Sequence, residues 1–523
     1  MQVLVAAAEC APWSRESGVA DAITGLVDAL HNPTGTKTMA AQSMAAQSMA
    51  AKAGVAGPNA AGAPDPVDVH VITPMYRCVW RTALQLPIPP REVIPARDIL
   101  VGDQRFSMRV MEVMQPRGQP HLWFVDCPAL FDRGGLYADS HDRRYSDNPQ
   151  RFAAFCNAVL DFAPRLLGRA PDLVHCHDWP TALIPIMLEA RDDPFWDQTD
   201  TLLTIHDVRE QGVFPRSAME QMGLPWSLFR IDGVEFWGKV NALKGGLIFA
   251  DGVNTVNRAT ARLLQTSTHG GGLEGVLADR PDSLVGIEHG LDTRSWDPAF
   301  DTALATPFSH EDLSGRSACR KALTKKMAMR GGEKQPIFGL LGPFSQDCGT
   351  DLVCEVADTV VQLGGRLVMH GDGDAALRDR LLGVSVRLRA DAALVIGQDE
   401  ELERMILGGV DVMLIPARWA PSSNVHLRAM LYGALPIVAD DGTLADAVVE
   451  ATPENISAGT ATGFRFDASD ADGLHATVRR AVACFHDRPV DWHTMMVDGM
   501  RRDFSWAVAA AEYEALFRGM RGG

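Results

Sequence analysis

Short apolar runs alternate along this chain with segments whose apolar residues recur at helical spacing. The chain opens on a nearly continuous apolar run over residues 1–8, and residues 20–30 then show helical periodicity. A short apolar run is typical of a buried parallel strand, so the opening predicts a strand that leads into a helix. Further runs follow at residues 67–72, 122–126, 152–167, 173–175, 202–205, 240–249 and 252–256. This alternation predicts parallel βαβ units.

A second series of the same kind occupies the rest of the chain. Its runs lie at residues 337–341, 352–363, 366–370, 393–396, 412–415, 426–432 and 435–438. Because 523 residues exceed what one hydrophobic core usually serves, we predict an α/β fold of two Rossmann-like, doubly wound domains facing a central cleft. The expected bounds are 1–283 and 284–502 for the domains and 503–523 for a C-terminal helix. Such domains bind ligands at the carboxyl ends of their strands, so the site is expected in the cleft.

Residues 31–67 interrupt the alternation with a tract rich in Ala, Gly and Pro. The tract contains two copies of the pentapeptide Met-Ala-Ala-Gln-Ser, which begin at Met39 and Met44. A segment of this composition has little to bury except alanine and methionine, so we expect a mobile, transiently helical surface insertion in the first domain. Its composition gives little indication of function, and the sequence does not determine its role.

The charge of the chain argues against one class of partner. The formal net charge is −17, because Asp and Glu outnumber Lys and Arg. Nucleic-acid binding requires clustered Lys and Arg, so nucleic acid is not expected as a partner. An anionic nucleotide can still bind in a local positive pocket, and each cation of that pocket then matters individually.

Hydropathy and cysteine content indicate a cytoplasmic protein. No apolar run reaches the ~20 residues of a spanning helix, so no membrane insertion is expected. No Lys or Arg precedes Arg15, so the start does not resemble an export signal. The nine cysteines are scattered without a C-x-x-C pair, which predicts neither a zinc site nor a disulfide framework and fits a reducing compartment.

The first candidate site is the turn that joins the opening strand to the first helix. Backbone N–H groups near Gly18 would point at an anion above this turn, because the N-terminus of a helix attracts negative charge. One glycine turn is a weak signal, however. An ordinary strand-to-helix loop fits the same residues equally well.

Histidines follow two of the predicted strands at their carboxyl ends. His175, His177 and Asp178 bring two imidazoles and a carboxylate together, and His206 ends the next predicted strand. The spacing of Cys176 and Asp178 does not match a metal site, so we interpret the segment as a polar cleft floor. A satisfied pair of core histidines is the alternative interpretation.

The motifs resemble those of bacterial glycogen synthases and plant starch synthases, whose opening reads S-x-E-x-x-P-x-x-K-T-G-G-L-A-D. The matching residues are Glu9, Pro12, Gly18, Ala20 and Asp21, with Arg15 at the lysine. Further matches, in chain order, include His177 with Asp178 in H-x-H-D-W, His206 in T-[IV]-H-N, the glycines Gly371 and Gly373, and the D-F-S-W motif at residues 503–506. Because the matches span nearly the whole chain, the resemblance implies the GT-B glycosyltransferase fold.

The resemblance also implies an activity and a set of site residues. The family transfers glucose from ADP-glucose to the non-reducing end of an α-1,4-glucan, with retention and without a metal. The implied partners are therefore ADP-glucose or another nucleotide sugar and an α-glucan, and no cofactor is implied. His206 and Asp21 are expected near the glucose. The other expected substrate-binding residues are Arg15 and Gly18 at the diphosphate, Arg418, Gly371 and Gly373 on the nucleotide side, and Glu9, His177 and Asp178.

Several residues depart from the family pattern where the donor is expected to bind. Pro343 and Cys348 stand at the arginine and lysine of G-R-L-x-x-Q-K-G, Ala420 stands at the glutamate of P-S-R-[FY]-E-P-C-G-L, and Thr443 replaces a glycine of the second anion-binding turn. Other departures are Pro180, Asp207, Glu210, His289 and Gln398. A departing diphosphate needs cations, and losing two charge-assisted hydrogen bonds costs about 3–6 kcal/mol, a rate factor on the order of 10²–10⁴. Impaired activity is therefore expected.

Three functions fit these residues. The first is a glucosyltransferase of this family whose activity is impaired. The second is a noncatalytic glucan-binding or regulatory protein, because the substitutions cluster at the donor while distant structural motifs persist. The third is a transferase for a different sugar nucleotide, whose charge would make the missing cations tolerable. The oligomeric state is not determined by the sequence.

Overall fold

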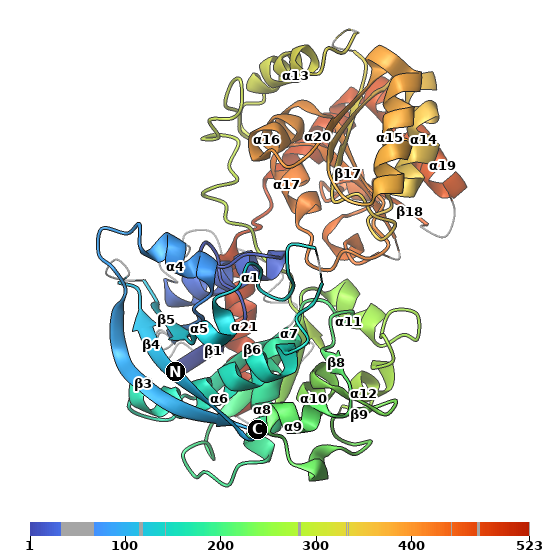
Figure 1. Cartoon of the computed structure of the whole chain (residues 1–523). Coiled ribbons are helices and arrows are strands. Elements are labelled where there is room, and N and C mark those ends of the chain that lie inside the picture. The colour runs from blue at the N-terminus through green and yellow to red at the C-terminus, as the bar shows by residue number, and fades with distance from the viewer. Residues whose placement is uncertain are drawn as a thin grey trace, which may run out of the picture. The chain divides into compact units, whose positions relative to one another are not determined.

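The chain forms two compact units, which are described separately below. The computed structural model describes residues 1–32, 67–114, 119–141, 143–280, 284–330, 332, 334–440, 442–467 and 471–521. One unit comprises Met1–Gly290 with Trp506–Gly523 and the other comprises Leu291–Ser505 (Figure 1). Nearly all of the insertion predicted at residues 31–67 lies outside the described residues. None of the described helices is both long and apolar enough to cross a bilayer.

A nine-stranded sheet lies at the centre of the first unit, in the order β12-β11-β7-β6-β1-β2-β5-β4-β3. Its strands are β1 (Gln2–Ala6), β2 (Asp68–Pro74), β3 (Arg91–Val101), β4 (Gln104–Glu112), β5 (His121–Asp126), β6 (Leu173–His177), β7 (Asp200–Ile205), β11 (Gly252–Thr255) and β12 (Val285–Gly286). The strands from β12 to β5 run parallel, and β4 and β3 add antiparallel pairs at one edge.

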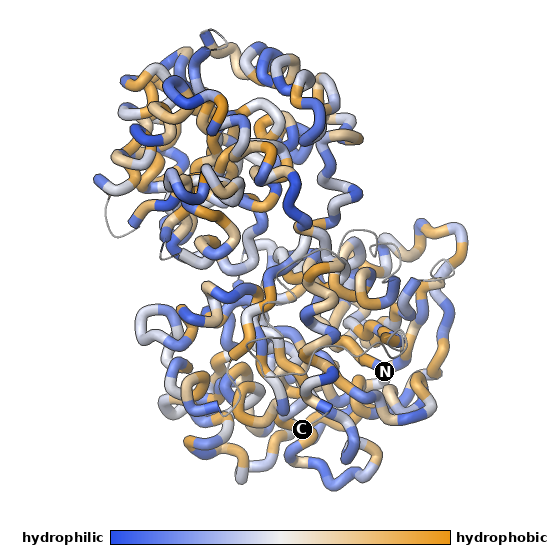
Figure 2. Tube along the Cα trace, turned by 180° about the vertical axis from the view of Figure 1, so that it is seen from behind, coloured by the Kyte–Doolittle hydropathy of each residue, from blue (hydrophilic) through white to orange (hydrophobic). Residues whose placement is uncertain are grey.

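The parallel strands are mostly buried because helices cover both faces of the sheet. Every residue of β1 is buried, and so is every residue of β6. Figure 2 shows hydrophobic stretches alternating with hydrophilic ones along the chain of each unit. The edge strand β3 differs, because most of its residues are exposed. Periodicity did not predict β3 and β4 for that reason.

The helices of the first unit follow its strands. They are α1 (Gly18–His31), α4 (Arg77–Ala83), α5 (Pro128–Phe131), α6 (Asn148–Leu167), α7 (Asp178–Thr181), α8 (Leu183–Glu189), α9 (Ala218–Met222), α10 (Ala242–Phe249), α11 (Arg258–Leu264), α12 (Glu274–Ala278) and α21 (Trp506–Arg521), with a 3₁₀ turn at Trp226–Leu228. Side chains cap several of them: Ser17 Oγ accepts a hydrogen bond from the Val19 N–H at α1, and Asn241 Oδ1 accepts one from Lys244 at α10.

A small antiparallel sheet, in the order β8-β10-β9, lies beside α10 in the chain. Its strands are β8 (Val213–Phe214), β9 (Glu235–Phe236) and β10 (Lys239–Asn241). The sequence predicted one continuous segment over residues 240–249. The structure instead ends β10 at Asn241 and begins α10 at the next residue, because the Asn241 side chain caps the helix.

The second unit contains a six-stranded, fully parallel sheet in the order β15-β14-β13-β16-β17-β18. Its strands are β13 (Ile337–Leu341), β14 (Arg366–Gly371), β15 (Ala392–Ile396), β16 (Val412–Ile415), β17 (Leu435–Ala439) and β18 (Phe464–Phe466). Its helices are α13 (Gly315–Lys326), α14 (Thr350–Gln362), α15 (Ala375–Leu388), α16 (Glu400–Gly409), α17 (Val425–Leu431), α18 (Pro453–Ser457), α19 (Ala471–Asp487) and α20 (Pro489–Met500), with 3₁₀ turns at Arg389–Asp391 and Ala445–Ala447. The strands predicted at 337–341 and 412–415 coincide with β13 and β16.

The last helix, α21, returns to the first unit after the chain has completed the second. In Figure 1 the red α21 lies among the blue and green elements of the first unit. Its first residue, Trp506, packs so closely on α1 that a Cβ on Gly25 would overlap the indole ring. The C-terminal helix that we expected as a separate segment over residues 503–523 is therefore part of the first unit.

Candidate functional site

Four histidines form a row at the carboxyl ends of the first unit's parallel strands. His175 and His177 lie on β6, His206 follows β7 and His289 follows β12. The ring centroids are 4.2 Å apart from His175 to His177, 5.3 Å from His177 to His206 and 5.2 Å from His206 to His289. The first two side chains share a face because residues two apart in a strand point the same way. We call these four residues the histidine row.

Hydrogen bonds set the tautomer at one end of the row. His175 Nε2 lies 2.7 Å from Thr204 Oγ1, and that hydroxyl donates to Asn254 Oδ1. Because a hydroxyl has a single proton to donate, Thr204 must accept from His175, which therefore carries its proton on Nε2. Asn254 in turn donates to the Tyr513 hydroxyl on α21. This chain of hydrogen bonds connects the row to the last helix.

The central pair of the row is His177 and His206. His177 Nδ1 lies 3.1 Å from His206 Nε2, and both side chains are almost fully buried. Burial lowers the pKa of both imidazoles well below the usual value, and it lowers the pKa of His175 and of His289 to about 3. All four rings are therefore neutral at pH 7. They can donate and accept hydrogen bonds but supply no positive charge.

Asp178 fixes the backbone at the central pair. Its Oδ1 accepts a hydrogen bond of 2.7 Å from the His206 backbone N–H. Its own backbone is left-handed, with φ of 54°, which is rare for a residue other than glycine. Burial raises the pKa of the Asp178 carboxyl well above its usual value. In this structure Asp178 is therefore a positioning residue for His206.

Glu9 shapes the turn that carries Gly18. Its carboxylate accepts hydrogen bonds from the backbone N–H groups of Glu16 (2.8 Å) and Ser17 (3.0 Å), from Ser17 Oγ (2.9 Å) and from the Tyr137 hydroxyl (3.2 Å). Burial raises its pKa, although these hydrogen bonds oppose the shift. Gly18 itself begins α1 and is exposed, so the first turn of α1 is open to solvent.

Arg15 and Asp21 form an ion pair across the same turn. Arg15 Nη2 lies 2.6 Å from Asp21 Oδ2, and about 63% of the Arg15 side chain is exposed. An exposed pair of this kind contributes little to stability, so the guanidinium can exchange partners at small cost. Whether Arg15 binds a diphosphate, as the resemblance implies, stays a prediction.

In the second unit, Arg418 is held by the N-terminus of α14. Its guanidinium donates to Asp351 Oδ1 (2.9 Å) and Oδ2 (3.0 Å) and to the Gln346 carbonyl (2.8 Å). Burial works to raise the pKa of Asp351, but hydrogen bonding and charge from Arg418 lower it overall. A bidentate pair between an arginine and a carboxylate is strong, so Arg418 is anchored to the first turn of α14 and to the loop before it.

That loop, residues 342–349, packs on the glycine turn at Gly371 and Gly373. The Phe344 N–H donates to the Asp372 carbonyl (2.8 Å), and the Asp374 N–H donates to the Phe344 carbonyl (2.8 Å). Gly371 has φ of 147°, and a Cβ there would lie 2.6 Å from Gly342 Cα. Only glycine fits this close approach. The two glycines thus hold the loop against β14.

The substituted positions of the second unit carry no charge. Pro343 is neutral, and burial raises the pKa of the Cys348 thiol, so that side chain is uncharged at pH 7. Thr443 is 1% exposed, and its Oγ1 accepts a hydrogen bond of 3.0 Å from the Ala420 N–H. Ala420 and Thr443, which both depart from the family pattern, therefore contact each other. The Ala420 N–H is satisfied by this contact within the protein.

The structure brings the predicted residues together in small groups. His177, Asp178 and His206 form one group, Glu9 with the Gly18 turn a second, and Arg418 with the loop that Gly371 and Gly373 support a third. Sequence reasoning assigned no role to Thr204, Tyr137, Asp351 or Trp506. The Trp506 ring packs against His289 in a tilted arrangement, with centroids 5.2 Å apart. Its occurrence in the D-F-S-W motif was the only sequence signal for it.

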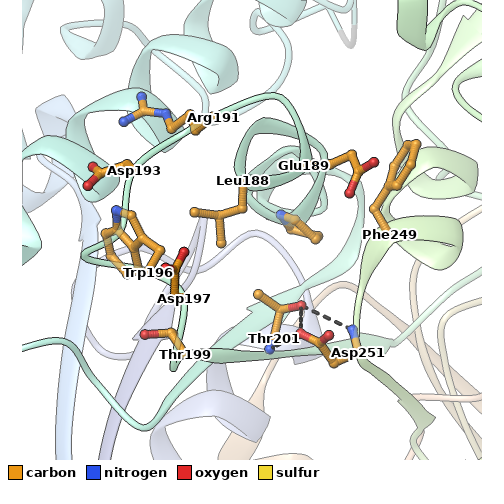
Figure 3. A pocket seen from close by; sticks show the side chains of 11 residues that line it. Leu188, Glu189, Arg191, Asp193, Trp196, Asp197, Thr199, Thr201, Phe249 and Asp251 are labelled. Atoms are coloured by element: carbon orange, nitrogen blue, oxygen red, sulfur yellow. Dashed lines mark hydrogen bonds between the residues drawn. The ribbon is translucent and has the colours of Figure 1, made fainter.

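A cavity of about 200 Å³ lies at the amino ends of the first unit's strands, where β7 and β11 begin. Figure 3 shows Trp196, Thr201, Phe249 and Asp251 around it, and Asp251 accepts hydrogen bonds from the Thr201 N–H and hydroxyl. Because the histidine row lies at the carboxyl ends of the parallel strands, the cavity is a separate feature. None of the predicted site residues lines it.

Within the part of the chain that the structure describes, no three His, Cys, Asp or Glu side chains are arranged to hold a metal ion. The histidine row explains this locally. Its rings are tilted against one another, with His175 Nε2 on Thr204 and His177 Nδ1 on His206 Nε2, so these nitrogens are bound elsewhere than to a common point.

Known proteins are similar to this chain over nearly its whole length. The family described as "Starch synthase catalytic domain" matches residues 58–279. Glycogen synthase 2 of Geobacter sulfurreducens is 34% identical over 520 residues, which cover 99% of this chain and 98% of that protein. Glycogen synthase of Granulibacter bethesdensis is also 34% identical, with the same shares covered over 522 residues.

Two solved structures extend the comparison to three dimensions. The catalytic domain of starch synthase IV from Arabidopsis thaliana, bound to ADP and acarbose, superposes with a TM-score of 0.81 at 25% identity and covers 100% of this chain and 99% of that one. Sucrose-phosphate synthase from Thermosynechococcus elongatus gives a TM-score of 0.56 at 16% identity over the same shares. The second likeness is one of fold alone.

Proposed function

This chain belongs to the glycogen and starch synthase family, and from that membership we propose that it transfers glucose from ADP-glucose to the non-reducing end of an α-1,4-glucan, with retention and at a reduced rate. The family and the GT-B fold of Rossmann-like domains that the sequence predicted are confirmed. The donor, the acceptor, the roles of individual residues and the reduced rate are proposals.

The observation that carries the proposal is the central histidine pair. His206 lies at the carboxyl end of β7, where an α/β sheet binds its ligand, and its backbone is tied to Asp178. A neutral imidazole held in this way can donate one hydrogen bond to a sugar hydroxyl without bringing a competing charge. His206 is thus proposed to contact the glucose, and His177 to hold its ring.

The proposed reaction breaks the bond between the anomeric carbon and the diphosphate oxygen while a bond to the acceptor hydroxyl oxygen forms on the same face. The acceptor proton leaves with the released ADP. Negative charge grows on the diphosphate, so stabilisation must come from N–H groups and cations. The exposed N-terminus of α1 at Gly18 favours an anion, and Arg15 supplies a guanidinium once Asp21 releases it.

The reduced rate follows from the second unit. Pro343 and Cys348 are uncharged, and Arg418 is already bound to Asp351. The leaving group is therefore proposed to depend mainly on the α1 turn. A deficit of two charge-assisted hydrogen bonds corresponds to a rate factor on the order of 10²–10⁴.

A second candidate function is noncatalytic glucan binding. The hydrogen bond between Thr443 and the Ala420 N–H favours it, because a backbone donor in the substituted loop is already satisfied within the protein. A protein of this kind would bind glycogen and leave ADP-glucose unchanged. A third candidate, use of a different sugar nucleotide, is distinguished by the donor that is consumed.

The test measures glucose incorporation from radiolabelled ADP-glucose into glycogen by the purified full chain, beside glycogen co-sedimentation. We expect slow incorporation that the His206→Ala substitution lowers by about 10²-fold or more, while co-sedimentation persists. The matched control is His493→Ala, which removes an exposed histidine on α20 and is expected to change neither measurement.

Each alternative has its own outcome in this assay. Incorporation at the rate of an ordinary glycogen synthase would contradict the reduced rate. Binding of glycogen without any incorporation would establish the noncatalytic function instead. Consumption of UDP-glucose in place of ADP-glucose would establish the altered donor.

A further inference from the structure

The turn between β9 and β10 carries a tryptophan that folding alone does not explain. Phe236 pairs with Lys239 across the hairpin, so Trp237 and Gly238 form a two-residue turn. Both have positive φ, 52° and 76°, which defines the type I′ turn that favours Asn-Gly or Gly-Gly. A bulky side chain at the first of these positions is strained.

Packing does not compensate for this strain. About 85% of Trp237 is exposed, so the indole has little contact with the rest of the protein. About 82% of Ile231 is exposed as well. An exposed, strained aromatic residue at a turn tip indicates a role in contacting something outside the chain.

The segments that carry these two side chains are held rigidly. The buried Lys244 ammonium donates hydrogen bonds of 2.5 Å to the Ile231 carbonyl and of 2.5 Å to the Glu235 carbonyl. Glu235 Oε1 also accepts a hydrogen bond of 2.7 Å from the Gly238 N–H. We call Ile231 and Trp237 with this support the tip platform. Because the surface is preformed, ordering it costs little entropy when a ligand binds.

The charges around the tip platform favour a neutral partner. Asp232 and Glu235 are balanced by Arg230 and Lys239, and Arg230 forms an ion pair of 3.2 Å with Asp232. Neither a polyanion nor a polycation finds a complementary field there. A membrane surface would require clustered basic residues, which the tip lacks. Two apolar side chains are also far smaller than the ~800 Å² per partner of a stable interface between copies.

The tip platform is continuous with the loop that follows His206. Asn241, at the inner end of β10, donates a hydrogen bond of 2.6 Å from Nδ2 to Gln211 Oε1, and the Leu243 N–H donates to the Gln211 carbonyl. Trp237 lies at the far end of the hairpin whose inner end contacts this loop. A long polymer at the histidine row could therefore extend along the hairpin to the tip platform.

We propose that the tip platform is a secondary glucan-binding surface, on which the C–H face of an α-linked glucose ring stacks against Trp237. Aromatic rings suit this partner because a pyranose ring presents an apolar face rimmed by hydroxyl groups. This inference rests on the proposed function for the choice of polymer. It adds a contact distant from the histidine row.

The test uses Trp237→Asn in the full chain, because binding and stability should then change in opposite directions. Asparagine suits the type I′ turn, so the melting temperature should rise by about 2 °C. Glycogen affinity, measured by co-sedimentation, should fall by about fivefold or more. Trp237→Phe should keep most of the binding. The matched control is Phe300→Asn, an exposed aromatic residue of the second unit, which should leave glycogen affinity unchanged.

Transfer to maltotriose, measured in parallel, separates this inference from the proposed function. Absence of transfer to any acceptor would reject the proposed function and leave the binding comparison valid. Unchanged glycogen affinity in Trp237→Asn, or a wild-type protein that does not bind glycogen, would overturn the tip platform. A lower melting temperature for Trp237→Asn would also count against it, because the turn would then have favoured tryptophan for folding.

Discussion

The histidine row of the first unit and the second unit's loops around Arg418 and Ala420 differ in what their polar groups do. In the row, neutral imidazoles are aligned by Asp178, Thr204 and each other at the carboxyl ends of buried strands. In the loops, Arg418 is bound to Asp351 and the Ala420 N–H is bound to Thr443. Both regions bind their polar groups within the protein, but the groups of the row are neutral imidazoles, whereas Arg418 is a cation held by a carboxylate.

The comparison teaches that recognition and leaving-group stabilisation can separate. Sugar recognition needs hydrogen bonds of modest strength from oriented neutral groups, and we propose that the histidine row of the first unit supplies them. Departure of a diphosphate needs concentrated positive charge, which costs more to replace once it is lost. The second unit has a complete parallel sheet and the glycine turn at Gly371 and Gly373, so the proposed loss of cations does not depend on a change of fold.

The largest expected effect comes from returning cations to the second unit, which tests whether their absence limits the reaction. We expect the double substitution Pro343→Arg with Cys348→Lys to raise glucose incorporation from ADP-glucose into glycogen by about 10²–10⁴-fold, because two charge-assisted contacts to the diphosphate are restored. The measurement is initial rate at saturating glycogen.

A control for this variant adds the same charge elsewhere. Leu382 and Val386 on α15 are 53% and 69% exposed, so Leu382→Lys with Val386→Arg changes net charge equally without entering the loop. Equal rates in the two double variants would show that the missing cations do not limit the reaction.

Acid should destabilise the first unit before the second. In the unfolded chain histidine titrates near pH 6.5, whereas burial lowers the pKa of His175 to about 3 in the folded protein. The unfolded chain then binds more protons between these values, so the free energy of unfolding falls as pH falls from 6.5. For His175 alone the loss is about 2 kcal/mol at pH 5, and His177 and His206 act in the same direction.

Hydrogen exchange resolved by peptide checks this expectation. As pH falls, peptides of β6 and α21 should lose protection from exchange at a higher pH than peptides of β13 and β16. The first unit contains several buried histidines with lowered pKa, whereas His426 of the second unit lies outside such a group. His175→Gln removes a titrating group and should reduce the acid sensitivity of the first unit, whereas His426→Gln should not. Simultaneous loss of protection in both units would contradict the contrast.

The smallest expected effect concerns the Arg418–Asp351 pair. Asp351→Asn should lower the free energy of unfolding of the second unit by about 1 kcal/mol at pH 7, since both side chains are partly exposed. Because the folded pKa of Asp351 is lowered, the pair stabilises the protein above the unfolded pKa near 4 and loses its effect as pH falls through the folded value.

Urea unfolding at pH 7 and in acid measures this difference. The control is Asp358→Asn on the same helix, whose partner is Arg387 in a more exposed pair. We expect almost no change for that variant. If the two substitutions cost the same at pH 7, Arg418 is not anchored more firmly than an ordinary surface arginine.

Much of the fold could be predicted because parallel strands covered on both faces are continuous apolar runs. The segments at 337–341 and 412–415 are examples, and they coincide with β13 and β16. The hairpin of β3 and β4 could not be predicted this way, since most β3 residues are exposed and its apolar residues are interrupted by charged ones. The β9–β10 turn was also missed, because tryptophan is not a turn-forming residue.

The candidate site was predictable in its residues but not in its pairings. Family motifs singled out His206, Asp178, Arg15 and Arg418. They did not reveal that Asp178 binds the His206 backbone, or that Asp21 and Asp351 pair with the two arginines. A partner 67 residues away in the chain, as Asp351 is from Arg418, leaves no local pattern to read.

The sequence by itself determined the family, the strand-rich α/β framework and the absence of cations at Pro343 and Cys348, because these depend on residue type and local spacing. Only the tertiary structure decided that α21 returns to the first unit, that its Trp506 contacts His289, and that Arg418 is bound to a carboxylate. Charge and burial act through space, so whether a side chain is available to a ligand depends on neighbours that the order of residues does not specify.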